Sequence, residues 1–407
     1  MEGRRYPVST RTSPRSYVLH AMFRRSITIA AVALLATGLT AGTAAASPSR
    51  VRLLGEQIVP FNLPFQGTTV GGLSAIDRDP RTGQYVLISD DRSAVNPARF
   101  YTARIDVDAA GIHSVDFTGT HPFLRPDGKT YPTIKDWTAT PCTASRDVCD
   151  RDGSVDPEEL RVDPWTGNIT WSQEGERILT PQPVLLDPSI RQVRPDGSYV
   201  GQYPLPANER MSADNVGPRQ NQTLEGITYA AAGTLLVSEL EDPLLQDGAD
   251  PTATSGALTR ITVQSRFGPV LAQYAYPIDP LFAPSPSAND TNGVSSMVAY
   301  DPIDPTRYLM VERAFVTGVG NKVRVYEIDT LGATNIKDVA SIAGKKIKPV
   351  SKKLLVDLDT LGLPKVDNVE GITWGPTLPT GERTLLLVSD NNFNAGQITQ
   401  VIALAVR

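Results

Sequence analysis

The segment Val369-Glu370-Gly371-Ile372-Thr373 is followed after eleven residues by Leu385-Leu386-Leu387-Val388-Ser389-Asp390, and this pair of segments indicates the fold of the chain. Short apolar and β-branched runs bounded by Gly, Pro and Asp are typical of β-strands. The segment therefore predicts two antiparallel strands joined by a turn, with an acid near the start of the first strand and another at the end of the second.

The same unit occurs five times along the chain. The steps between equivalent positions are 84, 67, 70 and 75 residues, and further strand-like stretches in each unit bring the number to about four strands. Radial repetition of four-stranded antiparallel sheets is a β-propeller. We therefore predict an all-β fold over residues 47–407, a single propeller of five blades, or of six if residues 330–366 hold a degenerate blade. Pairing of residues 51–59 with residues 397–406 would close the ring.

The repeat predicts an acidic rim. The two marked positions of each hairpin lie at the same end of an antiparallel pair, so the ring brings ten positions together. Two of them, Ser74 and Ser295, are serines. Eight are carboxylates: Asp90, Glu158, Glu174, Glu225, Glu239, Glu312, Glu370 and Asp390.

So many like charges need a positive partner, and the sequence offers two kinds. Ca²⁺, or another divalent cation, binds carboxylate oxygens. The predicted metal ligands are Glu158, Glu225, Glu239, Glu312, Glu370 and Asp390. Arg92 and Arg313, with Arg177 nearby, are the other partners and could hold an anionic substrate. Glu225, Glu370, Arg92 and Arg313 are the predicted catalytic residues. The alternative is that the acids bind backbone N–H groups and arginines, and so join neighbouring blades.

The N-terminus predicts export. Arg24-Arg25, the apolar residues 27–39 and Ala44-Ala45-Ala46 match a signal peptide over residues 1–46, with translation starting at Met22. We expect a secreted or cell-envelope protein without a membrane anchor after cleavage. In an oxidising compartment Cys142 and Cys149 are expected to form a disulfide.

Composition excludes several classes of function. The 407 residues carry a net charge of −5, which argues against a nucleic-acid partner. Two cysteines cannot build a Cys₄ zinc site. A Ser-His-Asp hydrolase would have to use His113 or His121, in loop-like surroundings. Asp150, Asp152 and Asp156 cluster after Cys149, but they fit an EF-hand loop poorly.

A set of linked motifs gives the chain a likeness to a known family. The motifs are Gly72-Leu73-Ser74, Leu224-Glu225-Gly226-Ile227-Thr228, Ser238-Glu239, and Asn368-Val369-Glu370-Gly371-Ile372 with Ser389-Asp390-Asn391. As a set they resemble the phytase-like, or "esterase-like activity of phytase", family of exported bacterial proteins. The resemblance covers roughly residues 60 to 400. It implies a β-propeller with hydrolytic activity on phosphate or carboxylate esters. The chain departs from β-propeller phytases in having few lysines near its acids.

Three functions are compatible with these observations. The first is a secreted, calcium-dependent phosphoester hydrolase that acts as a monomer on a small-molecule ester. The second is a non-catalytic extracellular propeller that binds a ligand or a protein. The third is a lactonase or carboxylesterase, because a metal-activated water can also attack an acyl carbon.

Overall fold

A computed structural model describes residues 50–140, 142–284, 287 and 289–407. The predicted signal peptide, residues 1–46, lies outside the described residues. In the described part of the chain, no helix has the length and apolar character needed to cross a membrane.

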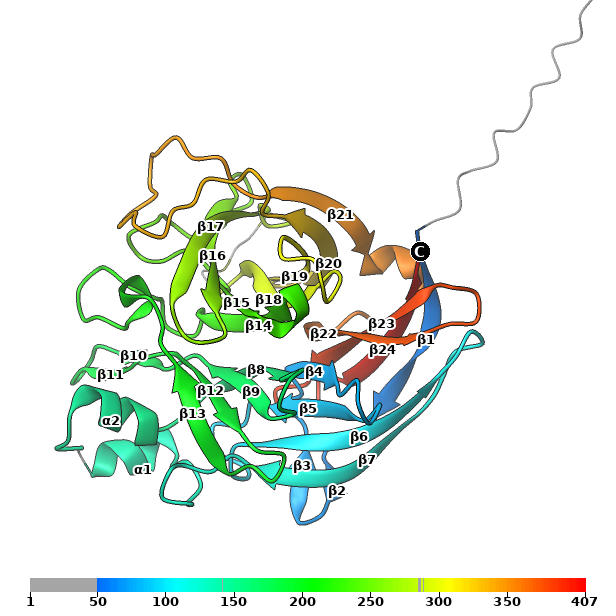
Figure 1. Ribbon diagram of the computed structural model, residues 1–407, viewed down its shortest axis with the longest axis horizontal. Helices are drawn as coiled ribbons and strands as arrows, with labels where there is room; N and C mark the ends of the chain where they lie inside the picture. Colours follow the sequence, from blue (N-terminus) through cyan, green and yellow to red (C-terminus); the bar gives the residue numbers. More distant parts are fainter. Residues whose placement is uncertain (1–49, 141, 285–286, 288) are drawn as a thin grey trace, which may run out of the picture. The chain divides into compact units, whose positions relative to one another are not determined.

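Five four-stranded antiparallel sheets surround a common centre (Figure 1). Blade 1 consists of β4 (Ala75–Arg78), β5 (Tyr85–Ser89), β6 (Arg99–Val107) and β7 (Ile112–Pro122). Blade 2 consists of β8 (Pro157–Val162), β9 (Ile169–Gln173), β12 (Ser189–Val193) and β13 (Tyr199–Tyr203). Blade 3 consists of β14 (Leu224–Ala230), β15 (Leu235–Leu240), β16 (Ala257–Ser265) and β17 (Val270–Ile278). Blade 4 consists of β18 (Thr291–Ala299), β19 (Arg307–Val316), β20 (Gly320–Asp329) and β21 (Ser351–Asp357). Blade 5 consists of β22 (Asn368–Thr377), β23 (Arg383–Asp390), β24 (Thr399–Val406) and β1 (Val51–Val59).

Closure of the ring agrees with the prediction. β1 pairs antiparallel with β24, from Val51 opposite Val406 to Val59 opposite Thr399, so both ends of the described chain share one blade. The innermost strands β4, β8, β14, β18 and β22 contact one another in sequence around the ring. Residues 330–366 contribute β21 as the fourth strand of blade 4, so the described residues form five blades and not six.

The remaining elements are short insertions. They are the hairpin β2 (Leu63–Phe65) and β3 (Thr68–Val70), the hairpin β10 (Glu176–Ile178) and β11 (Val184–Leu186), helices α1 (Ile134–Ala139) and α2 (Arg146–Asp152), and the 3₁₀ turns η1 (Ala207–Glu209), η2 (Ala231–Gly233) and η3 (Leu358–Leu361). Cys142 and Cys149 form the predicted disulfide, which links α2 to the residues before it.

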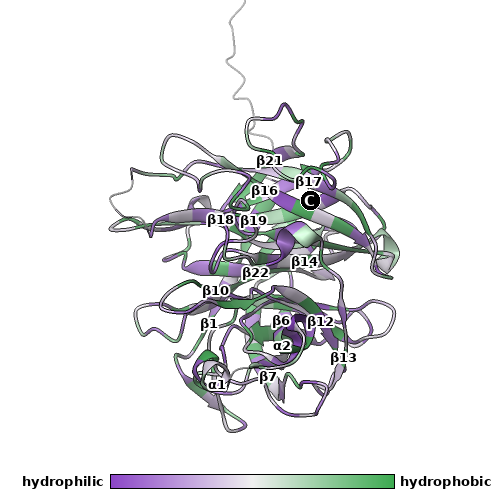
Figure 2. Ribbon diagram, turned by 90° about the vertical axis from the view of Figure 1, so that its left-hand side faces the viewer, coloured by the Kyte–Doolittle hydropathy of each residue, from purple (hydrophilic) through white to green (hydrophobic). Residues whose placement is uncertain are grey.

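The core lies between the blades. Leu385 and Leu387 of β23 pack against blade 4, while Leu386 and Val388 pack against blade 1. Successive side chains of a strand point to opposite faces, so one apolar strand fills two interfaces. Figure 2 shows hydrophobic and hydrophilic bands following one another along the strands. The apolar runs of the sequence thus specify the contacts between blades.

Candidate functional site

One mouth of the central channel holds a cavity of about 450 Å³. Its walls combine six carboxylates with two guanidinium groups and several amides. The charged lining residues are Asp90, Asp156, Glu158, Glu225, Glu241, Glu370, Arg92 and Arg313. Glu158, Glu225 and Glu370, which come from three different blades, therefore line a shared cavity.

β-Bulges aim the first acid of each hairpin. The register of β14 against β15 shifts at Glu225, and the register of β22 against β23 shifts at Glu370. Glu158 lies in the corresponding irregularity of β8, and Ser295 lies in that of β18. A bulge leaves its extra residue out of the ladder and redirects the side chain. The repeated motif therefore encodes a bulge at the channel mouth as well as a strand.

The two serines of the repeat join blades instead of adding charge. The Ser74 hydroxyl donates to the backbone oxygen of Glu158 at 2.7 Å, and the Ser295 hydroxyl donates to the backbone oxygen of Val369 at 3.1 Å. Each bond links one inner strand to the next. The first acids of the hairpins consequently come from blades 2, 3 and 5 alone.

Acids that directly follow the second strand of a hairpin lie at or beside the mouth. Asp90 and Glu241, directly after β5 and β15, line the cavity. Glu174, directly after β9, does not line it, but its carboxylate lies within 4.8 Å of those of Glu158 and Glu225. Glu239 and Glu312, in contrast, lie within β15 and β19 and outside the cavity lining.

The two in-strand acids have different surroundings. Glu239 is buried, and neither of its carboxylate oxygens has a hydrogen-bond partner among the described residues. Glu312 accepts a hydrogen bond from the Tyr276 hydroxyl at 2.7 Å and forms an ion pair with Lys352. Lys352 of the same blade thus balances the charge of Glu312, and Tyr276 of blade 3 donates a hydrogen bond to it.

Asp390 has an intermediate position. It is the last residue of β23, is almost fully buried and accepts a hydrogen bond from the Asn392 N–H at 2.8 Å. Its other carboxylate oxygen has no hydrogen-bond partner among the described residues. Burial, followed by the charge of Glu370, raises the pKa of Asp390 well above its usual value. Asp390 therefore interacts with the charge of Glu370, which lines the cavity, although Asp390 itself does not line it.

Gly72 allows blade 1 to approach the acids. It has a φ of +62°, and a Cβ at this position would lie 2.1 Å from Oδ1 of Asp90. The Gly72 N–H donates to the Asn391 side chain at 3.0 Å, which ties the loop after β23 to blade 1. A larger residue here would displace Asp90.

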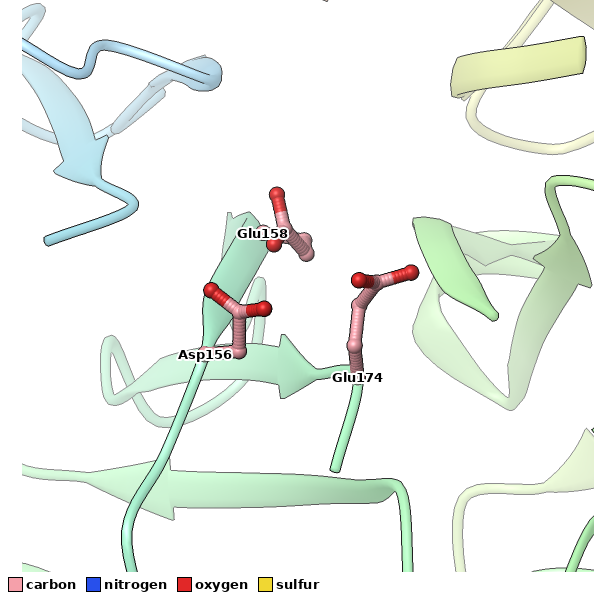
Figure 3. Close-up of side chains that lie close together, drawn as sticks. All are labelled: Asp156, Glu158 and Glu174. Atoms are coloured by element: carbon pink, nitrogen blue, oxygen red, sulfur yellow. The ribbon is translucent and has the colours of Figure 1, made fainter. Parts of the chain in front are cut away.

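Two groups of three carboxylates could each hold a metal ion. They are Asp156 with Glu158 and Glu174, and Glu174 with Glu225 and Glu241; within each group the oxygen atoms lie within 4.8 Å of one another. Figure 3 shows the carboxylates of the first group pointing toward one another. Glu174 belongs to both groups: one of its oxygens accepts the Thr223 N–H at 2.6 Å and the other has no hydrogen-bond partner among the described residues. A donor set of carboxylate oxygens suits a hard cation.

Protonation equilibria reflect the crowding of these acids. Burial, followed by repulsion from Asp156 and Glu241, raises the pKa of Glu174 to about 8. Burial and then the charges of Glu174, Glu241 and Glu370 raise the pKa of Glu225 well above its usual value. Without a cation the cluster therefore retains protons near neutral pH, and a bound cation would displace them.

The two predicted arginines lie at the cavity. Arg92 forms ion pairs with Asp156 and Glu176, and Arg313 lies 3.3 Å from both Glu241 and Glu370. The Nε of Arg313 is buried and has no hydrogen-bond partner among the described residues.

Arg177 lies elsewhere. Its guanidinium donates to the backbone oxygens of Ser212 and Asp214. It therefore secures a loop and does not line the cavity.

Sequence reasoning missed two of the lining acids. Glu241 stands two residues beyond the aligned Glu239, and Asp156 was grouped with Asp150 and Asp152. Asp150 pairs with Arg146, and Asp152 pairs with Arg151, so these three aspartates do not form one loop site. The signal that could have identified both missed acids is their proximity to strand ends, directly after β15 and directly before β8.

Fold and cavity define the chain as a five-bladed β-propeller with a carboxylate-lined mouth. The chain belongs to the Phytase-like family, described as "Esterase-like activity of phytase", which matches residues 68–393. No curated protein sequence matches the chain.

Solved structures that match most of the chain share little sequence with it. An N-acetylgalactosamine deacetylase from F. plautii has 11% identity and a TM-score of 0.43, with 88% of this chain and 95% of that chain covered. A putative glycoside hydrolase from Parabacteroides distasonis has 10% identity and a TM-score of 0.38, with 87% and 93% covered. An α-L-arabinanase from Penicillium chrysogenum has 12% identity and a TM-score of 0.38, with 82% and 80% covered.

Proposed function

We propose that the protein is an exported, calcium-dependent hydrolase of small phosphoesters and that the acidic mouth is its active site. The observation that carries this proposal is the convergence of six carboxylates and two arginines on one cavity. Two groups of three carboxylates, which combine lining acids with the adjacent Glu174, have the spacing of metal ligands. The irregular arrangement suits Ca²⁺, which accepts six to eight oxygens, better than the octahedral demands of Mg²⁺.

Glu174, Glu225 and Glu241 would hold the ion, with Asp156 and Glu158 forming a second position that shares Glu174. A divalent cation bound there supplies a Lewis acid that polarises the ester oxygen and lowers the pKa of a water molecule. Of the acids named here, Glu174 alone is common to both groups, so its loss would affect both positions.

The remaining charged groups have separate roles. Arg92 and Arg313 would bind the phosphoryl oxygens and stabilise the negative charge that develops on them. Glu370 belongs to neither three-carboxylate group, and burial raises its pKa, so it suits the role of general base toward the attacking water. The cavity lining contains no lysine among the described residues, which favours a substrate with one phosphate over a polyphosphate.

The decisive experiment compares Glu225→Gln with Asp116→Asn as a matched control. Asp116 is an exposed carboxylate on β7, remote from the inner strands. Purified variants would be assayed with 4-nitrophenyl phosphate, inositol hexakisphosphate and a γ-lactone, with Ca²⁺ and with a chelator. Calcium binding would be measured by titration calorimetry on the same samples.

We expect Glu225→Gln to lose calcium binding and phosphomonoester hydrolysis together, while Asp116→Asn retains both. Full hydrolysis in the presence of the chelator would refute the mechanism. Hydrolysis of the lactone alone would identify a lactonase on the same scaffold. Calcium binding that stabilises the fold without turnover of any substrate would identify a binding propeller.

A further inference from the structure

A second cavity, of about 420 Å³, lies at the opposite end of the same inner strands. The acidic mouth is lined by Glu158 of β8, Glu225 of β14 and Glu370 of β22. The second cavity is lined by the residues three positions further along the same strands, which are Arg161, Thr228 and Thr373. Three strand residues span roughly 10 Å. The two cavities share no lining residue among those described.

Arg161 separates the two cavities. Its guanidinium donates to the backbone oxygens of Ile76 at 3.0 Å, Met297 at 2.6 Å and Ile372 at 3.0 Å, and so joins blades 1, 4 and 5 across the axis. It also pairs with the buried carboxylate of Glu159 at 2.9 Å. A ligand in the second cavity therefore does not reach the acidic mouth through the channel.

The charges of the second cavity are opposite in sign to those of the acidic mouth. Its one carboxylate, Asp77, is turned into the fold, where its oxygens accept the Thr373 hydroxyl and the Val162 N–H, both at 2.8 Å. Arg78 and Arg383 also line the cavity. The Arg383 guanidinium donates to the backbone oxygen of Tyr300 at 2.6 Å and feels the charge of Asp301. Arg78 forms no ion pair within the described part of the chain, and a guanidinium without such a partner favours an anionic ligand.

Flat, rigid side chains form part of the wall. Trp165, which is 51% exposed, and Trp374 both line the cavity, and their N–H groups donate to the backbone oxygens of Ala232 and Ala299. Guanidinium groups cover part of both rings: that of Arg266 lies 3.9 Å from the Trp165 centroid, and that of Arg383 lies 3.5 Å from the Trp374 centroid. The remaining exposed surface of Trp165 is apolar and suits a ring. Pro80, Pro164 and Pro302 extend this surface.

We propose that this second cavity binds an organic anion with a planar ring: the ring lies against Trp165 and the anionic group contacts Arg78. This binding does not depend on the hydrolase proposed for the acidic mouth.

Titration calorimetry with indole-3-acetate tests the proposal, and the uncharged indole-3-acetamide serves as the matched ligand. The variants are Arg78→Gln and Trp165→Leu, with Arg104→Gln on exposed β6 surface and Trp137→Leu in α1 as controls. Thermal melts verify that each variant is folded. We expect indole-3-acetate to bind with one-to-one stoichiometry, and both cavity variants and the amide ligand to weaken binding by about tenfold or more.

Glu225→Gln distinguishes the two mouths. It should leave indole-3-acetate binding unchanged, and Arg78→Gln should leave phosphoester hydrolysis unchanged. The proposal is overturned if indole-3-acetate does not bind, if its affinity is the same in Arg78→Gln, or if Glu225→Gln abolishes its binding. Binding of glucuronate in place of the indole acid would overturn the assignment of a planar ring.

Discussion

Replacement of Glu174 by Gln should stabilise the metal-free protein at pH 8. Glu174 is 1% exposed and belongs to both three-carboxylate groups. Gln retains the oxygen that accepts the Thr223 N–H but removes the titrating charge. The neighbouring Glu225 also benefits, because Glu174 is the largest charge acting to raise the pKa of Glu225.

The magnitude follows from linkage between protonation and folding. The pKa of Glu174 rises from 4.5 in the unfolded chain to about 8 in the folded protein. The folded state therefore holds a proton that the unfolded state releases, and stability falls as pH rises through this window. At 1.36 kcal/mol for each pH unit, this carboxyl lowers the free energy of unfolding by about 5 kcal/mol between pH 4.5 and pH 8. For a protein of this size the loss corresponds to a melting temperature lower by roughly 6 °C.

Thermal melts of both proteins with a chelator at pH 4.5, 6 and 8 provide the assay. The difference in melting temperature should be near zero at pH 4.5 and largest at pH 8, in favour of Glu174→Gln. Added calcium should narrow the difference at pH 8, because saturation at one hundred times Kd stabilises the wild type by about 2.7 kcal/mol, roughly half of the gap between the two proteins without metal. A variant that is less stable than wild type at pH 8 without metal, or a difference that is independent of pH, would refute the reasoning.

Further substitutions test the placement of single residues. Glu241→Gln should lower hydrolysis by about a hundredfold or more, because it removes a charged ligand, whereas Glu239→Gln should leave turnover within about threefold. Arg161→Met should lower the free energy of unfolding by about 3–5 kcal/mol in urea titrations, because it leaves a buried carboxylate unpaired. Replacing Cys142 and Cys149 by Ser should cost about 2 kcal/mol in the same titrations, because the disulfide closes a loop over a sequence separation of only 7.

A different outcome would contradict each of these three expectations. Equal losses of activity in Glu239→Gln and Glu241→Gln would show that the reaction also involves Glu239, which lies outside the cavity lining. Wild-type stability of Arg161→Met would show that the axial hydrogen bonds are dispensable. A loss much larger than 2 kcal/mol without the disulfide would show that α1 and α2 carry more of the fold than their exposed residues suggest.

The local sequence contains the information for the five blades and for their closure. Strand alternation along 385–388 places every second residue on one face, and the repeat spacing places each hairpin in an equivalent position. The shared mouth of Glu158, Glu225 and Glu370 follows from the same two properties.

Tertiary pairing decides which of the second acids reach that mouth. Glu239 and Asp90 end similar motifs, yet β15 continues past Glu239 to Leu240, whereas β5 ends at Ser89 before Asp90. The extent of a ladder depends on hydrogen-bond partners in neighbouring strands and on bulges, and the alternation of a single strand does not specify it. The sequence alone therefore determined a propeller with an acidic rim, and only the folded contacts decided that Glu241 and Asp156 complete it.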